Sequence, residues 1–143
     1  MKRVNTLLAA VILALSFGCT REAPKLDTPP PENALRSEVN DISPEHAVTR
    51  TEKAYAQFVD VRTPAEYATG HAARAINIPL DELPGKLDRL EKNEPVYVIC
   101  RTGRRSREAS EILVKSGYAW VFNVSGGMDA WTAAGLPTEI PRK

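Results

Sequence analysis

Residues 95–100, PVYVIC, form an apolar run that ends at a cysteine and leads directly into the basic segment RTGRRS, residues 101–106. The run is apolar at every position rather than at every second one, which is typical of a strand buried on both faces of a sheet. Such strands lie in parallel sheets that helices cover on both sides. The run therefore predicts the central strand of an α/β domain, with Cys100 as its last residue.

The chain from residue 41 onward alternates between strand and helix patterns. Ser43 and Pro44 suit an N-cap and a first helical position, and Thr63 and Glu66 form a capping box around Pro64. Strands that alternate with helices indicate a parallel sheet between two helical layers. Strands are predicted at 57–61, 75–80 and 121–124, helices at 42–50, 63–67, within 81–92, at 106–118 and 126–135, and an irregular tail at 136–143.

The first residues have the pattern of an export signal. Two basic residues precede the apolar stretch LLAAVILALSF, and the small residues Ser16 and Gly18 occupy positions −3 and −1 before Cys19. The apolar stretch is shorter than the roughly 20 residues that a permanent membrane-spanning helix needs. We therefore expect residues 1–18 to be a signal peptide that directs the protein to the periplasm or cell envelope.

Cys19 follows the expected cleavage point directly and resembles the lipid-modified cysteine of bacterial lipoproteins. A signal peptide of the lipoprotein type would leave a lipid on Cys19 and anchor the protein in a membrane. The open alternative is ordinary cleavage that leaves Cys19 unmodified, and the intact mass of the protein in the membrane fraction distinguishes the two. Residues 19–40 contain a proline triplet and read as an extended linker to a domain at 41–143.

Composition excludes several classes of function. The formal net charge of the chain is +1, so no overall field favours nucleic acid or a strongly acidic partner. The two cysteines and two histidines do not stand at the spacings of a structural zinc site, and the sequence predicts no metal and no cofactor. Any functional charge must therefore be local, and we expect the protein to be a monomer.

The segment after Cys100 has the features of an anion-binding loop. Gly103 allows the backbone to curl, and the first amides of a helix that starts at about Ser106 have no partner within that helix. The positive end of the helix dipole and the three arginines of the segment would stabilise a thiolate, so a lowered pKa is expected for this thiol. These features predict that Cys100 is an activated nucleophile. The plain alternative is a buried cysteine that only packs.

CRTGRRS (100–106) resembles the active-site loop of rhodaneses, the thiosulfate-type sulfurtransferases. FVDVRTPAEYATGHAARAINIP (58–79) and SGGMDAW (125–131) are similar to further segments of that family, in the same order, and the small exported phage-shock-type rhodaneses are the most similar. One departure is Ala72, where the family has a larger aliphatic residue. The resemblance covers residues 42–140 and implies a three-layer fold with a central parallel sheet.

The resemblance also implies a reaction. Cys100 would take a sulfane sulfur from thiosulfate or a similar donor as a persulfide, and a thiol or cyanide would accept it, in a covalent mechanism that needs no general base. The residues implied to bind substrate form the loop after Cys100: Arg101, Thr102, Gly103, Arg104, Arg105 and Ser106. Of the arginines, Arg101 and Arg105 are the ones we expect to face the substrate.

A supporting role is expected for charged residues that precede the site. Arg62 or Arg74 is predicted to pair with an acid, Asp60 or Glu66, and to brace the loops below the site. Three alternative functions stay open: a sulfur carrier that passes a persulfide to a protein, a rhodanese-like binding module, and a cysteine phosphatase. The phosphatase class requires an arginine at the sixth position after the cysteine, where this chain has Ser106.

Overall fold

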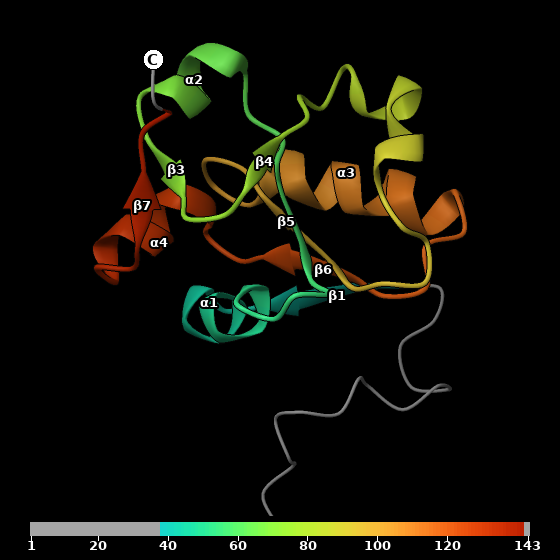
Figure 1. The fold of residues 1–143 in the computed structure, drawn as a ribbon, viewed down its shortest axis with the longest axis horizontal. Helices are drawn as coiled ribbons and strands as arrows, with labels where there is room; N and C mark the ends of the chain where they lie inside the picture. The colour runs from blue at the N-terminus through green and yellow to red at the C-terminus, as the bar shows by residue number, and fades with distance from the viewer. Residues whose placement is uncertain (1–37, 142–143) are drawn as a thin grey trace, which may run out of the picture.

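The computed structural model describes residues 38–141, and its centre is a sheet of five parallel strands (Figure 1). The order β1-β6-β5-β2-β4 places β5 in the middle, and its four residues are all buried, as its apolar sequence predicted. The α/β fold with a central parallel sheet is therefore confirmed. The strands are β1 Val39–Ile42, β2 Gln57–Asp60, β4 Ile76–Asn77, β5 Val96–Ile99 and β6 Val121–Val124.

Helices cover both faces of the sheet. Helix α3 (Arg104–Lys115) packs on one face, while α1 (Pro44–Thr51) and α4 (Gly127–Ala133) pack on the other (Figure 1). Because side chains alternate along a strand, β5 supplies both cores: Val98, together with Cys100 just after the strand, joins the core under α3, and Tyr97 and Ile99 join the core under α1 and α4. The thiol of Cys100 therefore points toward the side of the sheet that carries α3.

Two of the predicted helix starts, at Ser43 and Thr63, are confirmed. Ser43 caps α1 and accepts a hydrogen bond from the amide of His46, with Pro44 at the first helical position. Thr63 caps α2 (Pro64–Ala68), and Glu66 closes the capping box by accepting from the amide of Thr63. These caps need only residues within one turn of each other, so local sequence is sufficient to place them.

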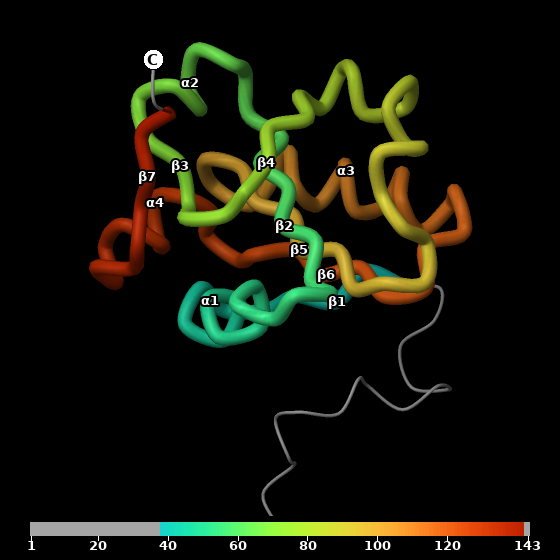
Figure 2. Tube along the Cα trace, in the orientation of Figure 1, coloured from blue at the N-terminus to red at the C-terminus, as the bar shows by residue number. Residues whose placement is uncertain are grey.

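The helix predicted within 81–92 is wrong. The segment forms two 3₁₀ turns, η1 (Leu83–Gly85) and η2 (Leu87–Arg89), on the long connection between β4 and β5 (Figure 2). Pro84 and Gly85 both oppose a continuing α-helix, and the hydroxyl of Tyr118 donates to carbonyls of this segment. Tertiary contacts therefore hold the connection in the tighter geometry. The strand predicted at 75–80 is also shorter, because only Ile76–Asn77 pairs with β2.

Two strands were missed at the ends of the domain. β1 begins at Val39, inside the segment predicted as linker. β7 (Thr138–Glu139) lies in the tail predicted as irregular and pairs antiparallel with β3 (His71–Ala72). Both strands are defined by partners far away in sequence, and neither has an extended apolar pattern of its own.

The signal peptide predicted for residues 1–18, Cys19 and the linker up to residue 37 lie outside the described residues, as do the last two positions. Between residues 38 and 141, no helix combines the length and the apolar character that crossing a bilayer requires.

Candidate active site

Cys100 lies directly after β5, at the carboxyl edge of the sheet, where open α/β sheets bind their ligands. The residue is a free cysteine and is 1% exposed. Its Sγ accepts a hydrogen bond from the backbone amide of Gly103 at 3.1 Å, and the hydroxyl oxygen of Ser106 lies 3.4 Å from the same sulfur. The thiol is thus enclosed by the loop and helix that follow it in the sequence.

Gly103 makes the turn from the loop into α3. Its φ of 94° is unfavourable for residues with a side chain, and a Cβ here would lie 3.2 Å from the amide nitrogen of Gly126. Its carbonyl accepts a hydrogen bond from the amide of Arg107 at 3.1 Å, so helical hydrogen bonding starts at Gly103. The helix therefore begins at Arg104, two residues earlier than predicted, and Arg104, Arg105 and Ser106 belong to its first turn.

The start of α4 holds the other side of the loop. The amide of Met128 donates to the carbonyl of Cys100 at 2.8 Å, and the amide of Asp129 donates to the carbonyl of Arg101 at 3.0 Å. Gly127, with a φ of 56°, allows this approach, because a Cβ at this position would lie 2.4 Å from the Cys100 carbonyl oxygen. Two helix starts from distant parts of the sequence therefore fix the loop on both sides of the sulfur.

The structure separates the three arginines that follow the cysteine. Arg101 is 69% exposed and lies 3.8 Å from Asp129. Arg104 is exposed, and its side chain forms no hydrogen bond or ion pair within residues 38–141. Arg105 instead donates two hydrogen bonds to Glu66, at 2.8 and 2.7 Å. Arg104 is thus free to attract an anion and Arg101 has only a long, exposed ion pair, whereas the Arg105 guanidinium is held closely by a carboxylate.

The expected supporting ion pair joins Arg62 to Asp60. Asp60 is fully buried, and Arg62 donates to both of its carboxylate oxygens and to the carbonyl of Gly70. The other predicted pairings are corrected: Glu66 binds Arg105, and Arg74 is exposed with a φ of 70° and no ion pair among the described residues. The Asp60–Arg62 pair is buried below the end of β2, so it fixes the neighbouring loop.

The Glu66–Arg105 pair makes stability depend on pH. The hydrogen bonds from Arg105 lower the pKa of Glu66 from 4.5 to about 2, so the carboxylate stabilises the folded state above about pH 4.5 and loses this contribution as the pH falls toward 2. Because the pair is partly exposed, we expect Glu66→Gln to cost ~1 kcal/mol or less at neutral pH. Urea unfolding of the native protein and of Glu66→Gln, from about pH 7 down to about pH 3, measures this effect. The difference between their free energies of unfolding should shrink as the pH falls.

Glu82→Gln is the control for this measurement, because it removes an exposed ion pair with Lys86 on a separate segment. This substitution should change the free energy of unfolding by close to zero at every pH measured. A Glu66→Gln difference that is the same at both ends of the pH range would show that the ion pair with Arg105 does not stabilise the fold.

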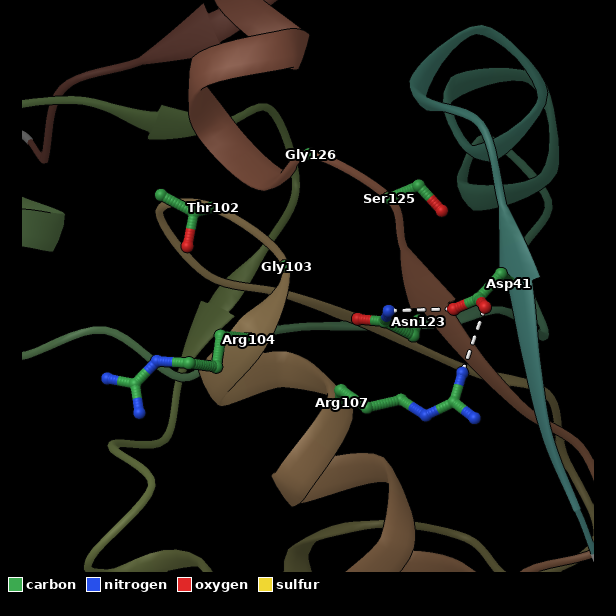
Figure 3. A pocket seen from close by; sticks show the side chains of 8 residues that line it. All are labelled: Asp41, Thr102, Gly103, Arg104, Arg107, Asn123, Ser125 and Gly126. Atoms are coloured by element: carbon green, nitrogen blue, oxygen red, sulfur yellow. Dashed lines mark hydrogen bonds and ion pairs between the residues drawn. The ribbon is translucent and has the colours of Figure 1, made fainter.

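Sequence reasoning missed a polar chain beside the loop. Ser106 donates to the side-chain oxygen of Asn123, whose amide nitrogen donates to Asp41, and Asp41 pairs with Arg107. Asp41, Asn123 and Arg107 line an open cavity of about 440 Å³ with Thr102, Gly103, Arg104, Ser125 and Gly126 (Figure 3). The signal in the sequence was Asn123 itself, since a polar residue inside the apolar strand VFNV needs a hydrogen-bond partner.

Within residues 38–141, no three side chains of His, Cys, Asp or Glu converge in a way that could hold a metal ion. The groups that surround the candidate nucleophile are backbone amides, hydroxyls and guanidinium groups. These are donors suited to an anion or to a sulfur that carries negative charge.

The fold and the site define an α/β domain that presents a buried thiol between the end of the central strand and the start of a helix. The profile of the family described as "Rhodanese-like domain" matches residues 43–134. The chain belongs to the rhodanese-like family. A sulfurtransferase of Allochromatium vinosum is 39% identical over 84 residues, which are 59% of this chain and 78% of that protein.

A second relative, the protein named thiosulfate sulfurtransferase GlpE of Actinobacillus pleuropneumoniae serotype 3, is 36% identical over 99 residues, 69% of this chain and 92% of that one. Among solved structures, a rhodanese-related protein of Thermoplasma volcanium is 33% identical with a TM-score of 0.65, covering 71% of this chain and 99% of that one. A rhodanese of E. coli solved with anions is 36% identical with a TM-score of 0.53, and the match covers 60% of this chain and 99% of that one.

Proposed function

We propose that this protein is a sulfurtransferase that carries a sulfane sulfur on Cys100 and takes it from an anionic donor such as thiosulfate. The observation that carries this proposal is the placement of the sulfur. Its Sγ accepts from the Gly103 amide at 3.1 Å, at the positive start of α3, with the exposed Arg101 and Arg104 nearby in the chain. The amide can stabilise negative charge that develops on Sγ, and the exposed arginines attract an anionic donor.

In the proposed reaction, each bond that forms is matched by a bond that breaks. The Cys100 thiolate attacks the outer sulfur of thiosulfate, the S–S bond of the donor breaks, and sulfite leaves with the electron pair. A persulfide remains on Cys100. An acceptor thiolate or cyanide then attacks the outer sulfur, and the Cys100 thiolate is restored. No step requires a general base, and within the described site the Gly103 amide is placed to stabilise charge on Sγ both before attack and as the persulfide is cleaved.

The relatives support this proposal. One is named a thiosulfate sulfurtransferase and another a sulfurtransferase, and a similar structure holds anions. Thiosulfate is a dianion, so the exposed guanidinium groups of Arg104 and Arg101 would attract it. The Glu66–Arg105 pair would then hold the first turn of α3 in place rather than bind substrate.

The relay alternative differs from the proposal in the partner and not in the site, whereas a binding module would use no sulfur chemistry at Cys100. A persulfide carrier would use the same sulfur chemistry at Cys100 and pass the sulfur to a protein. The phosphatase alternative lacks its main requirement: the sixth position after Cys100 is Ser106, which is fully buried and lies against Sγ, and it cannot clamp a phosphate in two places.

The test is whether Cys100 takes up sulfur. Incubating the purified protein with thiosulfate should add the mass of one sulfur atom to the peptide that contains Cys100, and cyanide should remove it and yield thiocyanate. Uptake from a persulfide donor but not from thiosulfate would favour the relay. Absence of uptake from either donor would refute sulfur transfer.

A further inference from the structure

A chain of hydrogen bonds runs from the surface to the sulfur of Cys100. Arg107 donates to Asp41 at 2.9 Å, and the amide nitrogen of Asn123 donates to the other oxygen of Asp41 at 2.8 Å (Figure 3). The hydroxyl of Ser106 donates to the side-chain oxygen of Asn123 at 2.6 Å. The same hydroxyl oxygen lies 3.4 Å from Sγ. Asn123 thus links a surface ion pair to the candidate nucleophile.

The sheet register brings these groups together. Asp41 of β1 is the register partner of Asn123 of β6, and Asn123 is also the register partner of Val98 of β5. Register partners in a parallel sheet point to the same face, and Val98 faces α3. Asn123 therefore points toward the first turn of α3, where it meets Ser106. Asn123 is 5% exposed and Ser106 is fully buried, so the contact between them is shielded from water.

The direction of each hydrogen bond follows from the carboxylate. An ionised carboxylate only accepts, so Asn123 must turn its amide nitrogen to Asp41 and its oxygen to Ser106. The Ser106 hydroxyl is within donating distance of two acceptors, Asn123 Oδ1 at 2.6 Å and Cys100 Sγ at 3.4 Å, but its single proton can serve only one, and the much shorter contact to Asn123 takes it. The hydrogen bond from Asn123 and the neighbouring Arg107 lower the pKa of Asp41, so the carboxylate keeps its charge at neutral and alkaline pH.

We propose that Asn123 is a positioning residue that directs the hydroxyl proton of Ser106 away from Cys100. Ser106 then presents a lone pair to the sulfur, and among the described residues the amide of Gly103 is the donor that stabilises the thiolate. The network therefore limits how much thiolate forms at rest. This inference rests on the proposed function, because it concerns the same cysteine. Its test, however, measures the reactivity of the thiol and not sulfur transfer.

The pH profile can be interpreted because Asn123→Ala removes none of the charged side chains on the elements packed around the site. They come from the end of β2, the active-site loop, β1, α2, α3 and α4, and they form ion pairs across these elements. The pairs are Asp60 with Arg62, Glu66 with Arg105, Arg101 with Asp129, and Asp41 with Arg107; Arg104 is exposed.

The experiment measures the rate of alkylation by iodoacetamide on the peptide that contains Cys100, as a function of pH. In Asn123→Ala the Ser106 proton can turn to the sulfur, and the midpoint of the pH profile should fall by roughly 0.5 to 1 pH unit. Ser106→Ala should not raise the midpoint, and Asn123→Ala should have no further effect in the Ser106→Ala background.

Two results would overturn the inference. If Ser106→Ala raises the midpoint, Ser106 donates its proton to the sulfur in the native protein. If Asn123→Ala fails to lower the midpoint, or lowers it equally without Ser106, then Asn123 does not act through that hydroxyl. Uptake of sulfur from thiosulfate is scored separately, so the proposed function and this inference can fail independently.

Asp41→Ala gives a second variant that is safer for folding, because Asp41 is exposed. Without the carboxylate, Asn123 can turn its amide nitrogen to Ser106, so the midpoint should again fall. Glu111→Ala is the matched control: it removes the other carboxylate near Arg107, at 3.8 Å, with the same change of charge and no contact with Asn123. A midpoint that moves equally in Asp41→Ala and Glu111→Ala would show a charge effect only, against the inference.

Discussion

Cys100→Ser is expected to lose sulfur transfer from thiosulfate to cyanide by about 10³-fold or more. Serine has nearly the same shape as cysteine, so the buried position between β5 and α3 can accept it. Its hydroxyl is not ionised at neutral pH, and oxygen in place of sulfur cannot carry the persulfide. The measurement is thiocyanate production by the variant and the native protein at equal concentrations, with the unfolding curves of both.

Ser110→Ala is the matched control for that substitution. Ser110 lies one turn after Ser106 on α3, is fully buried, and its hydroxyl has no hydrogen-bond partner among the described residues. Removing this hydroxyl should leave both transfer and stability near the native values. Full sulfur transfer by Cys100→Ser would show that another group carries the sulfur. Hydrolysis of an aryl phosphate that Cys100→Ser abolishes would support the phosphatase class instead.

Gly127→Ala is expected to destabilise the domain by about 3–5 kcal/mol and to reduce sulfur transfer. The added Cβ would lie 2.4 Å from the carbonyl oxygen of Cys100 and 2.6 Å from the carbonyl group of Arg101. These neighbours are backbone atoms of the active-site loop, which cannot move without breaking the hydrogen bonds from Met128 and Asp129. Urea unfolding measures the first effect and thiocyanate production the second.

Gly117→Ala is the control that distinguishes the effect of this close contact from the effect of backbone strain alone. Gly117 also has a positive φ, of 86°, but a Cβ there would meet nothing within 4 Å. Its substitution should cost about 1 kcal/mol and leave sulfur transfer unchanged. Equal losses of stability in the two variants would mean that the approach of α4 to the active-site loop does not matter.

The sequence was sufficient for the parts of the fold that depend on neighbouring residues. The uniformly apolar strand at Val96–Ile99 and the caps at Ser43 and Thr63 were predicted and confirmed. The helix within 81–92 was wrong, because contacts such as those from Tyr118 favour 3₁₀ turns over the local helix pattern. Short strands such as β7 could not be predicted, since two residues have no periodicity.

The same distinction between local and long-range features holds for the candidate site. By itself the sequence determined that Cys100 directly follows a buried strand and that Gly103 and three arginines come after it, because these are neighbours in the chain, although the strand ends at Ile99 and not at Cys100. Only the tertiary structure decided that Arg105 binds Glu66, that Gly127 lies against the loop, and that Asn123 reaches Ser106. Those contacts depend on sheet register and helix packing between segments far apart in sequence, which no local pattern specifies.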